Sequence, residues 1–257
     1  MKVFYLEQRQ YDVPDNNDWL SANERVRLNA MPIEKRRRDW RLGRWTAKLG
    51  LATFHRLTPY PGTLSSIEVR SAPSGAPEVF LEGKRALQQI SLSHSGDRAL
   101  LALSPEPTSV GCDLEKVEPR SPAFVEDYFT DDEQKLIIAL AEPDRSALIN
   151  LIWSAKESAL KVLGIGLNES THTVEVLFDS KPSLVAGRAG TWSTFCVRHR
   201  NGRLIHGLWR ERSCFIQTLA SRSPFDPAEL LPGWLSKSKQ MFMGHRQGRL
   251  LAESLKQ

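Results

Sequence analysis

The sequence has few cysteines and no long hydrophobic run. Its three cysteines, Cys112, Cys196 and Cys214, are odd in number and form no Cys-x-x-Cys pair. This pattern argues against a disulfide framework or a zinc site and fits a reducing cytoplasm. No apolar stretch approaches the length of a membrane span, and residues 1–11 lack the apolar core of a signal peptide. We therefore expect a cytoplasmic protein without a membrane partner.

Motifs for nucleic-acid binding are also missing, although the chain is basic, with a formal net charge of +5. A basic balance suits nucleic acid, an anionic cofactor or an acidic protein partner. The sequence has no zinc-finger spacing, no ribonucleoprotein aromatic motif and no clear recognition helix. It also lacks the Gly-x-Ser-x-Gly elbow of many serine hydrolases. We therefore expect neither a nucleic-acid partner nor that hydrolase chemistry.

The run Val110–Lys116 is the most informative part of the sequence. It is apolar up to Gly111 and then alternates an acid, a leucine and an acid. Residues two apart on a strand share a face, so Asp113 and Glu115 are predicted to project together at the end of a strand. Two close carboxylates repel each other unless a cation lies between them, and oxygen ligands suit Mg²⁺. A solvated strand edge is the alternative. Cys112 is expected to pack on the opposite, buried face.

A second run, Leu151–Lys161, has helical spacing. Trp153, Glu157 and Lys161 are four residues apart and share one stripe of the helix. This stripe offers a third carboxylate beside an ammonium group. As a simple surface ion pair, Glu157 and Lys161 would contribute only about 0.2–0.5 kcal/mol. Combined with the two acids of the strand, the stripe predicts a metal-bound phosphate site.

Both runs resemble signatures of the 4'-phosphopantetheinyl transferases, in their larger, pseudodimeric, surfactin-synthetase-activating form. The first family pattern, Gly-x-acid-x-Glu-Lys, is met by Gly111, Asp113, Glu115 and Lys116. The second, Trp-Ser-x-Lys-Glu followed by Lys and Gly-x-Gly-Leu, is met by Trp153, Ser154, Lys156, Glu157, Lys161, Gly164, Gly166 and Leu167. Upstream, Ser93-His94-Ser95 looks like the family's Ser-His-Ser turn. The three matches occur in the family's order, across roughly residues 20–170.

The resemblance implies a Mg²⁺-dependent transferase. The family moves the phosphopantetheine arm of coenzyme A to a serine of an apo acyl or peptidyl carrier protein and releases adenosine 3',5'-bisphosphate. By position, Asp113, Glu115 and Glu157 correspond to the metal ligands. Glu157, or a water that it holds, and Lys161 are the implied catalytic groups. Coenzyme A and the carrier are the implied partners, and we expect a monomer.

The family also implies a set of residues that contact coenzyme A: Arg25, Arg44, Ser93, His94, Asp113, Lys156 and Lys161. The two lysines would meet the diphosphate. One departure concerns Ala76, because the family usually has Gly-Lys-Pro where this chain reads Gly-Ala-Pro. One phosphate-binding lysine is therefore missing, and Lys84 or Arg85 are the candidates to replace it.

Two other functional classes remain open from the sequence. One is a non-catalytic protein that binds a carrier protein or coenzyme A, against which the intact acids and Lys161 argue. The other is a Mg²⁺-dependent phosphodiesterase, which the Trp-Ser-x-Lys-Glu helix disfavours. For carrier docking, Phe124, Tyr128 and Phe129 follow the acidic strand and would offer an apolar contact, with core packing as the alternative.

The resemblance implies an α+β fold of two similar halves related by a pseudo-twofold, with the ligand between them. A proline-rich break at Ser104–Pro107 gives the halves 1–107 and 108–257. A weak internal echo between residues 44–49 and 152–157 agrees with this division.

Sequence periodicity predicts the secondary structure. Helices are expected at residues 33–54, 127–141 and 150–163, the second opened by a Thr130–Glu133 capping box. A basic stripe on the first helix (Arg37, Arg41, Arg44 and Lys48) is either a phosphate contact or a solvated face. Strands are expected at residues 98–103, 174–178, 193–198 and 214–219, and residues 73–83 as a turn-rich connection.

Overall fold

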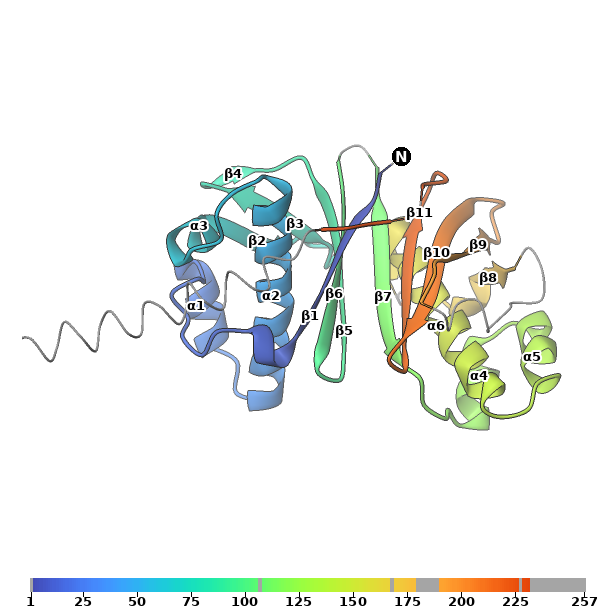
Figure 1. Cartoon of the computed structure of the whole chain (residues 1–257). Helices are drawn as coiled ribbons and strands as arrows, with labels where there is room; N and C mark the ends of the chain where they lie inside the picture. The colour runs from blue at the N-terminus through green and yellow to red at the C-terminus, as the bar shows by residue number, and fades with distance from the viewer. Residues whose placement is uncertain (1, 106–107, 167–168, 179–189, 227, 232–257) are drawn as a thin grey trace, which may run out of the picture.

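The computed structural model describes residues 2–105, 108–166, 169–178, 190–226 and 228–231. It combines helices and sheets, which confirms the predicted α+β class. Figure 1 shows α1–α3 with β2–β4 on one side of the molecule and α4–α6 with β8–β11 on the other, with β5, β6 and β7 between them. No helix within the described ranges is both long enough and apolar enough to cross a membrane.

The N-terminal part builds two sheets around one long helix. A four-stranded sheet has the order β12-β1-β6-β5 and a three-stranded sheet the order β2-β3-β4. Their bounds are β1 Phe4–Arg9, β2 Ile67–Ser71, β3 Pro77–Leu81, β4 Lys84–Arg85, β5 Gln89–Ser95, β6 Arg98–Ser104 and β12 Glu229–Leu230. The helices are α1 Ala22–Asn29, α2 Glu34–Phe54 and α3 Pro61–Ser66, after a short 3-10 turn, η1 Gln10–Asp12. β12 returns from the C-terminal end of the described chain and pairs in parallel with β1.

The C-terminal part builds a five-stranded antiparallel sheet of order β7-β11-β10-β9-β8, and α6 packs against it. The strands are β7 Val110–Lys116, β8 Val174–Leu177, β9 Ser193–His199, β10 Leu204–Arg212 and β11 Phe215–Ser221. The helices are α4 Pro122–Tyr128, α5 Asp131–Ile138 and α6 Asp144–Leu163, with a 3-10 turn, η3 Thr171–Thr173. β7 also contacts β5 and β6, so the two parts meet along these strands.

The helix predictions hold for the two long helices and fail in one place. α2 agrees with the helix expected at residues 33–54, and α6 confirms the one expected at 150–163 but begins earlier. α6 ends at Gly164, whose φ of 75° is the left-handed conformation that glycine adopts easily. The single helix expected at 127–141 is wrong, because α4 and α5 replace it. Thr130 is extended and caps α5 with Glu133, as the capping box predicts, and this cap separates the two helices.

The predicted strands at residues 98–103, 174–178, 193–198 and 214–219 correspond to β6, β8, β9 and β11. Several strands were not predicted, among them β10 and β3. β10 lies in the middle of the sheet and buries both faces, so it lacks the polar alternation of a half-exposed strand. β3 lies in the segment expected to be a connection and begins with Pro77, a position where a strand tolerates proline.

Some predictions fall outside the described residues. These are residues 106–107 of the expected hinge, Leu167 of the Gly-x-Gly-Leu motif and residues 232–257 of the tail.

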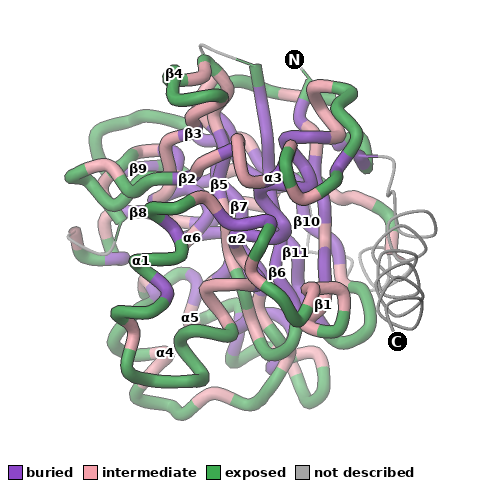
Figure 2. The backbone as a smooth tube through the Cα atoms, turned by 90° about the vertical axis from the view of Figure 1, so that its left-hand side faces the viewer, coloured by how far each residue is buried: buried purple, intermediate pink, exposed green. Residues whose placement is uncertain are grey.

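Buried side chains form three clusters among the described residues. One lies between α6 and the five-stranded sheet, one around α2, and one between the two larger sheets. In Figure 2 the central strands are mostly buried, whereas α1 and α4 are mostly exposed. Cys112 belongs to the cluster between the sheets and is fully buried, as predicted for its side of the strand. The face on which Asp113 lies is therefore the opposite one, toward α6.

Candidate active site

A close approach of β7 and α6 creates the site. A Cβ at Gly111 would collide with the backbone carbonyl of Ser158, so only glycine lets the strand and helix lie this near. Asp113 lies two residues along the strand from Gly111. Glu157 and Lys161 lie on α6, on either side of Ser158. The glycine of the first motif thus brings the acids of the two motifs together.

Asp113 is at the centre of the site and is 4% exposed. Its Oδ1 accepts hydrogen bonds from Lys161 Nζ at 2.9 Å and from Ser93 Oγ of β5 at 2.8 Å. Lys161 Nζ also donates to the backbone carbonyl of Cys112 at 2.9 Å. The other oxygen, Oδ2, is buried and has no hydrogen-bond partner. One side of Asp113 is therefore fixed, and the other is open to a ligand.

Glu115 is held by two side chains, Trp153 and Arg120, to which the sequence analysis did not assign this role. Trp153 Nε1 donates to Oε1 at 3.0 Å, and Arg120 Nη2 donates to Oε2 at 2.9 Å. Arg120 Nε in turn donates to Asn150 Oδ1 at 3.0 Å. Burial, then the charge of Asp113, raises the pKa of Glu115 to about 7, against the opposing effect of Arg120. Only the helical stripe containing Trp153 could have indicated this arrangement from sequence.

Glu157 and Lys161 have pKa values shifted in the same direction by different causes. Burial, followed by repulsion from Asp113, raises the pKa of Glu157, and Lys161 opposes this. For Lys161, burial acts to lower the pKa, but the carboxylates of Asp113 and Glu157 outweigh it and the net pKa is raised. Glu157 Oε1 is buried without a hydrogen-bond partner. Lys161 is thus held protonated, and the raised pKa of Glu157 shows that Lys161 does not fully offset the burial of this carboxylate and its repulsion from Asp113.

These residues line one pocket of about 340 Å³ between β5, β7 and α6. The lining consists of Leu92, Ser93, His94, Asp113, Glu115, Trp153, Glu157 and Lys161. The structure therefore brings together the three predicted metal ligands, the predicted catalytic lysine and the Ser-His pair. Their roles in binding remain predictions.

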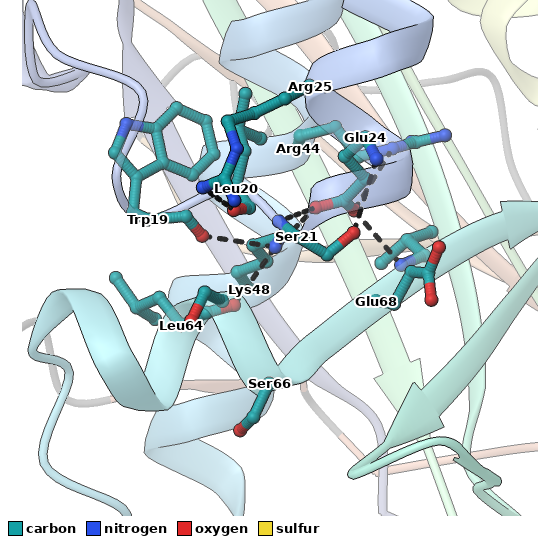
Figure 3. A network of polar contacts seen from close by, with 12 residues as sticks. Trp19, Leu20, Ser21, Glu24, Arg25, Arg44, Lys48, Leu64, Ser66 and Glu68 are labelled. Atoms are coloured by element: carbon teal, nitrogen blue, oxygen red, sulfur yellow. Dashed lines mark hydrogen bonds and ion pairs between the residues drawn. The ribbon is translucent and has the colours of Figure 1, made fainter.

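A second pocket, of about 440 Å³, adjoins the first, since Leu92 and His94 line both. Its other walls come from α2 and the residue before it: Ile33, Lys35, Arg36, Asp39, Trp40, Gly43 and Arg44. Arg44 lies 3.8 Å from Glu24 and stacks over the Trp40 ring at 4.9 Å (Figure 3 shows Arg44 and Glu24). Burial lowers the pKa of Arg44 to about 10, and Glu24 opposes the shift. Lys35 and Arg36 were not predicted, although the basic run that starts α2 was a visible signal.

The structure does not bring Lys156 or Arg25 into either pocket. Lys156 is fully buried, forms an ion pair with Glu133 at 2.7 Å, and donates to the carbonyls of Tyr128 and Thr171. It is adjacent to Glu157 in sequence, and neighbouring residues on a helix point about 100° apart, so the two cannot serve one site. Arg25 is exposed on α1 and donates to the Leu20 carbonyl at 2.9 Å (Figure 3). The contacts of these two residues with coenzyme A stay predictions that the lining of the two pockets does not support.

The candidates to replace the missing lysine also lie elsewhere. Lys84 and Arg85 form β4, and Arg85 pairs with Glu78 at 2.9 Å. Neither lines the two pockets. Lys35 and Arg36 instead line the α2 pocket, where their positive charges could contact a phosphate.

The acidic side chains of this pocket have a chemistry that suits a hard metal ion. No group of three or more His, Cys, Asp and Glu side chains is already arranged around a metal position within the described ranges. Asp113 Oδ2 and Glu157 Oε1 nevertheless are buried, unpartnered oxygens that line one pocket, which suits a hard cation. Glu115 already accepts one hydrogen bond on each oxygen, and each oxygen keeps a further lone pair. The residues thus fit Mg²⁺, with Asp113 and Glu157 as the most open ligands.

Comparisons with known proteins point to the same segment. Residues 109–211 match the family model described as the 4'-phosphopantetheinyl transferase superfamily. A putative 4'-phosphopantetheinyl transferase of Synechocystis sp. is 30% identical over 105 residues, which are 40% of this chain and 42% of the relative. A 4'-phosphopantetheinyl transferase of Bacillus subtilis is 31% identical over 77 residues, 30% of this chain and 34% of the relative. The chain thus spans less than half the length of the curated relatives it matches. The resemblance to the 4'-phosphopantetheinyl transferase superfamily is confirmed over residues 109–211, which carry β7 and α6.

Proposed function

We propose that this protein transfers the 4'-phosphopantetheine arm of coenzyme A to a serine of an apo acyl or peptidyl carrier protein. The observation that carries the proposal is the pocket in which Asp113 and Glu157 each keep an unpartnered buried oxygen beside Lys161. A diphosphate needs positive charge from a metal and from the protein, and this pocket can provide both. Its three carboxylates and Lys161 lie within the segment that matches the transferase superfamily, whereas Leu92, Ser93 and His94 precede it.

Coenzyme A would extend across the two adjoining pockets. The ammonium group of Lys161 would contact the diphosphate near Asp113, and Ser93 and His94 lie on the wall between this position and α2. Lys35, Arg36 and Arg44 would then be available for the remaining phosphate, since they line the second pocket. This assignment gives the α2 pocket the role that the missing Gly-Lys-Pro lysine has in the family.

Asp113, Glu157 and Glu115 would hold Mg²⁺ in this account. When bound, Mg²⁺ would neutralise diphosphate charge and polarise the bond that breaks. Arg120, Asn150 and Trp153 would keep Glu115 oriented through the hydrogen bonds described above. The position of Glu115 would therefore be set by the protein before any substrate binds.

The chain's own groups would also handle charge and the serine proton. Lys161, fixed by Asp113 and the Cys112 carbonyl, would offset charge on the phosphate in transfer and on the leaving adenosine 3',5'-bisphosphate. The serine of the carrier must lose its proton as it attacks. Glu157, whose Oε1 has no partner, is the proposed base, either directly or through a water that it holds.

An acidic carrier would be attracted by the basic chain, whose net charge is +5. Phe124 and Tyr128 of α4 lie next to the site, because their rings are each 5.1 Å from that of Trp153. Tyr128 is partly exposed, whereas Phe129 is fully buried and packs in the core. We therefore propose Phe124 and Tyr128, without Phe129, as the apolar contact for the carrier.

One incubation tests the proposal against its alternatives. The protein is mixed with coenzyme A, Mg²⁺ and an apo carrier, and the carrier is weighed by mass spectrometry. A gain equal to the phosphopantetheine arm is expected, and a carrier whose acceptor serine is replaced by alanine should gain nothing. Consumption of coenzyme A with an unchanged carrier would instead indicate a phosphodiesterase. Binding without either reaction would indicate a non-catalytic protein and overturn the proposal.

A further inference from the structure

A second cluster of charged residues lies where the two larger sheets face each other, away from the candidate active site. It lines a pocket of about 450 Å³ and includes Arg9, Arg98, Arg210, Arg212, Glu7 and Asp12. β1 and β6 supply one wall, and β10 supplies another. This pocket shares no lining residue with the candidate active site or with the α2 pocket.

Two of the arginines are buried and rigidly held. Arg98 is 6% exposed, donates from Nη1 to Glu7 Oε1 at 3.0 Å, and stacks over Phe215 at 4.3 Å. Arg210 is 7% exposed and lies against the rings of Tyr5 and Trp192, at 4.8 Å and 4.3 Å. Both guanidinium groups are therefore fixed before any ligand arrives, which lowers the entropy cost of binding.

A chain of hydrogen bonds connects these arginines across the two parts of the protein. Arg210 Nε donates to Gln217 Oε1 at 2.8 Å, and Gln217 Nε2 donates to Glu7 Oε2. Glu7 Oε1 accepts from Arg98. Glu7 therefore accepts one hydrogen bond from β6 and one from β11, and it is the acid that connects the two arginines.

Positive charge exceeds negative charge in this pocket. Its lining has four arginines and two acids. Arg9 and Arg98 are direct cross-strand partners in the β1–β6 register, where like charges repel. Arg9, Arg210 and Arg212 form no ion pair with a carboxylate in the part of the chain that the structure describes. Asp12 Oδ2 accepts the backbone N–H of Arg9 at 2.9 Å, as the cap of η1.

We propose that this pocket binds a small dianion of the phosphate class, either inorganic phosphate or a phosphate monoester. The lining carries two excess positive charges, Asp97 outside it offsets part of this excess at 3.9 Å from Arg98 Nε, and the planar donor fork of arginine suits phosphate oxygens. Because Arg98 and Arg210 are more than nine-tenths buried, a ligand must enter the pocket to reach them. A flat acidic protein surface could reach only Arg9 and Arg212. The bound anion would join β1 and β6 to β10 and so stabilise the junction between the sheets.

The proposal is independent of the transferase reaction and is tested without coenzyme A, Mg²⁺ or carrier. Binding of inorganic phosphate is measured by calorimetry and by thermal unfolding, at constant ionic strength set with sodium chloride. The test variant is Arg9→Gln with Arg212→Gln, because these two side chains lie at the accessible edge of the pocket. The matched control is Lys84→Gln with Arg85→Gln, which removes the same charge from β4, outside all three pockets. Melting temperatures in chloride alone check that both proteins are folded.

Phosphate should raise the melting temperature of the wild-type protein and of the control. The test variant should bind phosphate at least about tenfold more weakly for each arginine removed. Phenyl phosphate, a monoester, and polyglutamate are titrated in parallel to identify the source of the charge. Stronger binding of phenyl phosphate with the same dependence on the arginines would support an ester ligand. Equal phosphate affinity in the test variant and wild type, or an arginine-dependent response to polyglutamate alone, would overturn the proposal.

Discussion

Two buried lysines, Lys48 of α2 and Lys156 of α6, lie at positions that correspond in the internal sequence echo, and their surroundings are alike. Each is fully buried and paired with a buried glutamate, Glu24 for Lys48 and Glu133 for Lys156. Each lysine also donates to two backbone carbonyls from separate segments. Figure 3 shows the first of these networks, with Lys48 next to Glu24 and the carbonyls of Trp19 and Leu64.

The two glutamates are also used in the same way. Glu24 and Glu133 are each the fourth residue of a capping box, opening α1 and α5. The second oxygen of each accepts the backbone N–H of a strand residue, Val69 for Glu24 and Val176 for Glu133. A buried lysine in each half thus ties a short helix, a long helix and a strand together. The likeness indicates that this arrangement is structural in both places.

The next residues of the two helices differ in chemistry. In α2 the residues that follow Lys48 in the same spacing are Leu49, which is buried in the core, and Thr53, whose hydroxyl donates to the Leu49 carbonyl. In α6 they are Glu157 and Lys161, which line the candidate active site. The buried Lys–Glu pair therefore positions the long helix in each half, whereas the chemistry depends on the residues of the neighbouring helical stripe.

Removal of divalent metal would affect the α6 side most strongly. If Asp113, Glu115 and Glu157 hold Mg²⁺, excess chelator should abolish transfer to the carrier. Mn²⁺ should partly restore it, because both ions accept octahedral oxygen ligation. Transfer is measured as the mass gain of the carrier. Full activity in excess chelator would remove the metal from the account and leave the charge of Lys161 as the main contribution.

Substitution of either buried lysine tests whether the two buried Lys–Glu pairs contribute equally to stability. Lys48→Ala and Lys156→Ala should each lower the free energy of unfolding by about 3–5 kcal/mol, since each leaves a buried glutamate without its partner. Denaturant unfolding measures this, with Lys135→Ala on exposed α5 as a matched control of little effect. A stable Lys156→Ala protein that has lost affinity for coenzyme A would restore the ligand contact that the sequence first suggested.

The acids beside α6 should also give this half a pH dependence. Glu115 has a pKa raised from 4.5 to about 7, so the folded protein binds more protons than the unfolded chain between these values. Stability should therefore fall as pH rises through this window in metal-free protein, by on the order of 1–3 kcal/mol. Glu115→Gln should flatten the dependence, as measured by denaturant unfolding from pH 5 to pH 8. An unchanged slope in this variant would place the titration elsewhere.

The smallest expected effect concerns carrier docking next to α6. Phe124→Ala should raise the KM for the carrier by about fivefold, the order expected for truncating one interface side chain, with little change in kcat. Its melting temperature is the control, because Phe124 is partly buried against the core. If the folded variant keeps the wild-type KM, Phe124 serves the core alone.

The sequence motifs predicted much of the site, because local spacing fixes which residues share a face. Two-residue and four-residue periods placed Asp113, Glu115, Glu157 and Lys161 correctly in one pocket. What failed depends on contacts between distant segments. Lys156 can be buried because it pairs with Glu133 of another helix. Glu115 is oriented by Arg120, which in turn donates a hydrogen bond to Asn150.

The same limit explains the errors in the fold. α2 and α6 have strong helical periodicity and were predicted well. β10 was missed because a strand buried on both faces carries no alternating pattern. The break between α4 and α5 was misplaced, although the Thr130 cap that causes it was visible in the sequence.

The most direct test of the central claim is the turnover number of Glu157→Gln beside its melting temperature. Glutamine keeps the shape of the side chain while removing its charge, and Lys156 and Glu133 remain untouched. We expect an unchanged melting temperature with kcat lower by roughly a hundred- to a thousandfold, near 3–4 kcal/mol. Near-normal turnover with an unchanged melting temperature would contradict this mechanism, since Glu157 would then line the pocket without taking part in the reaction.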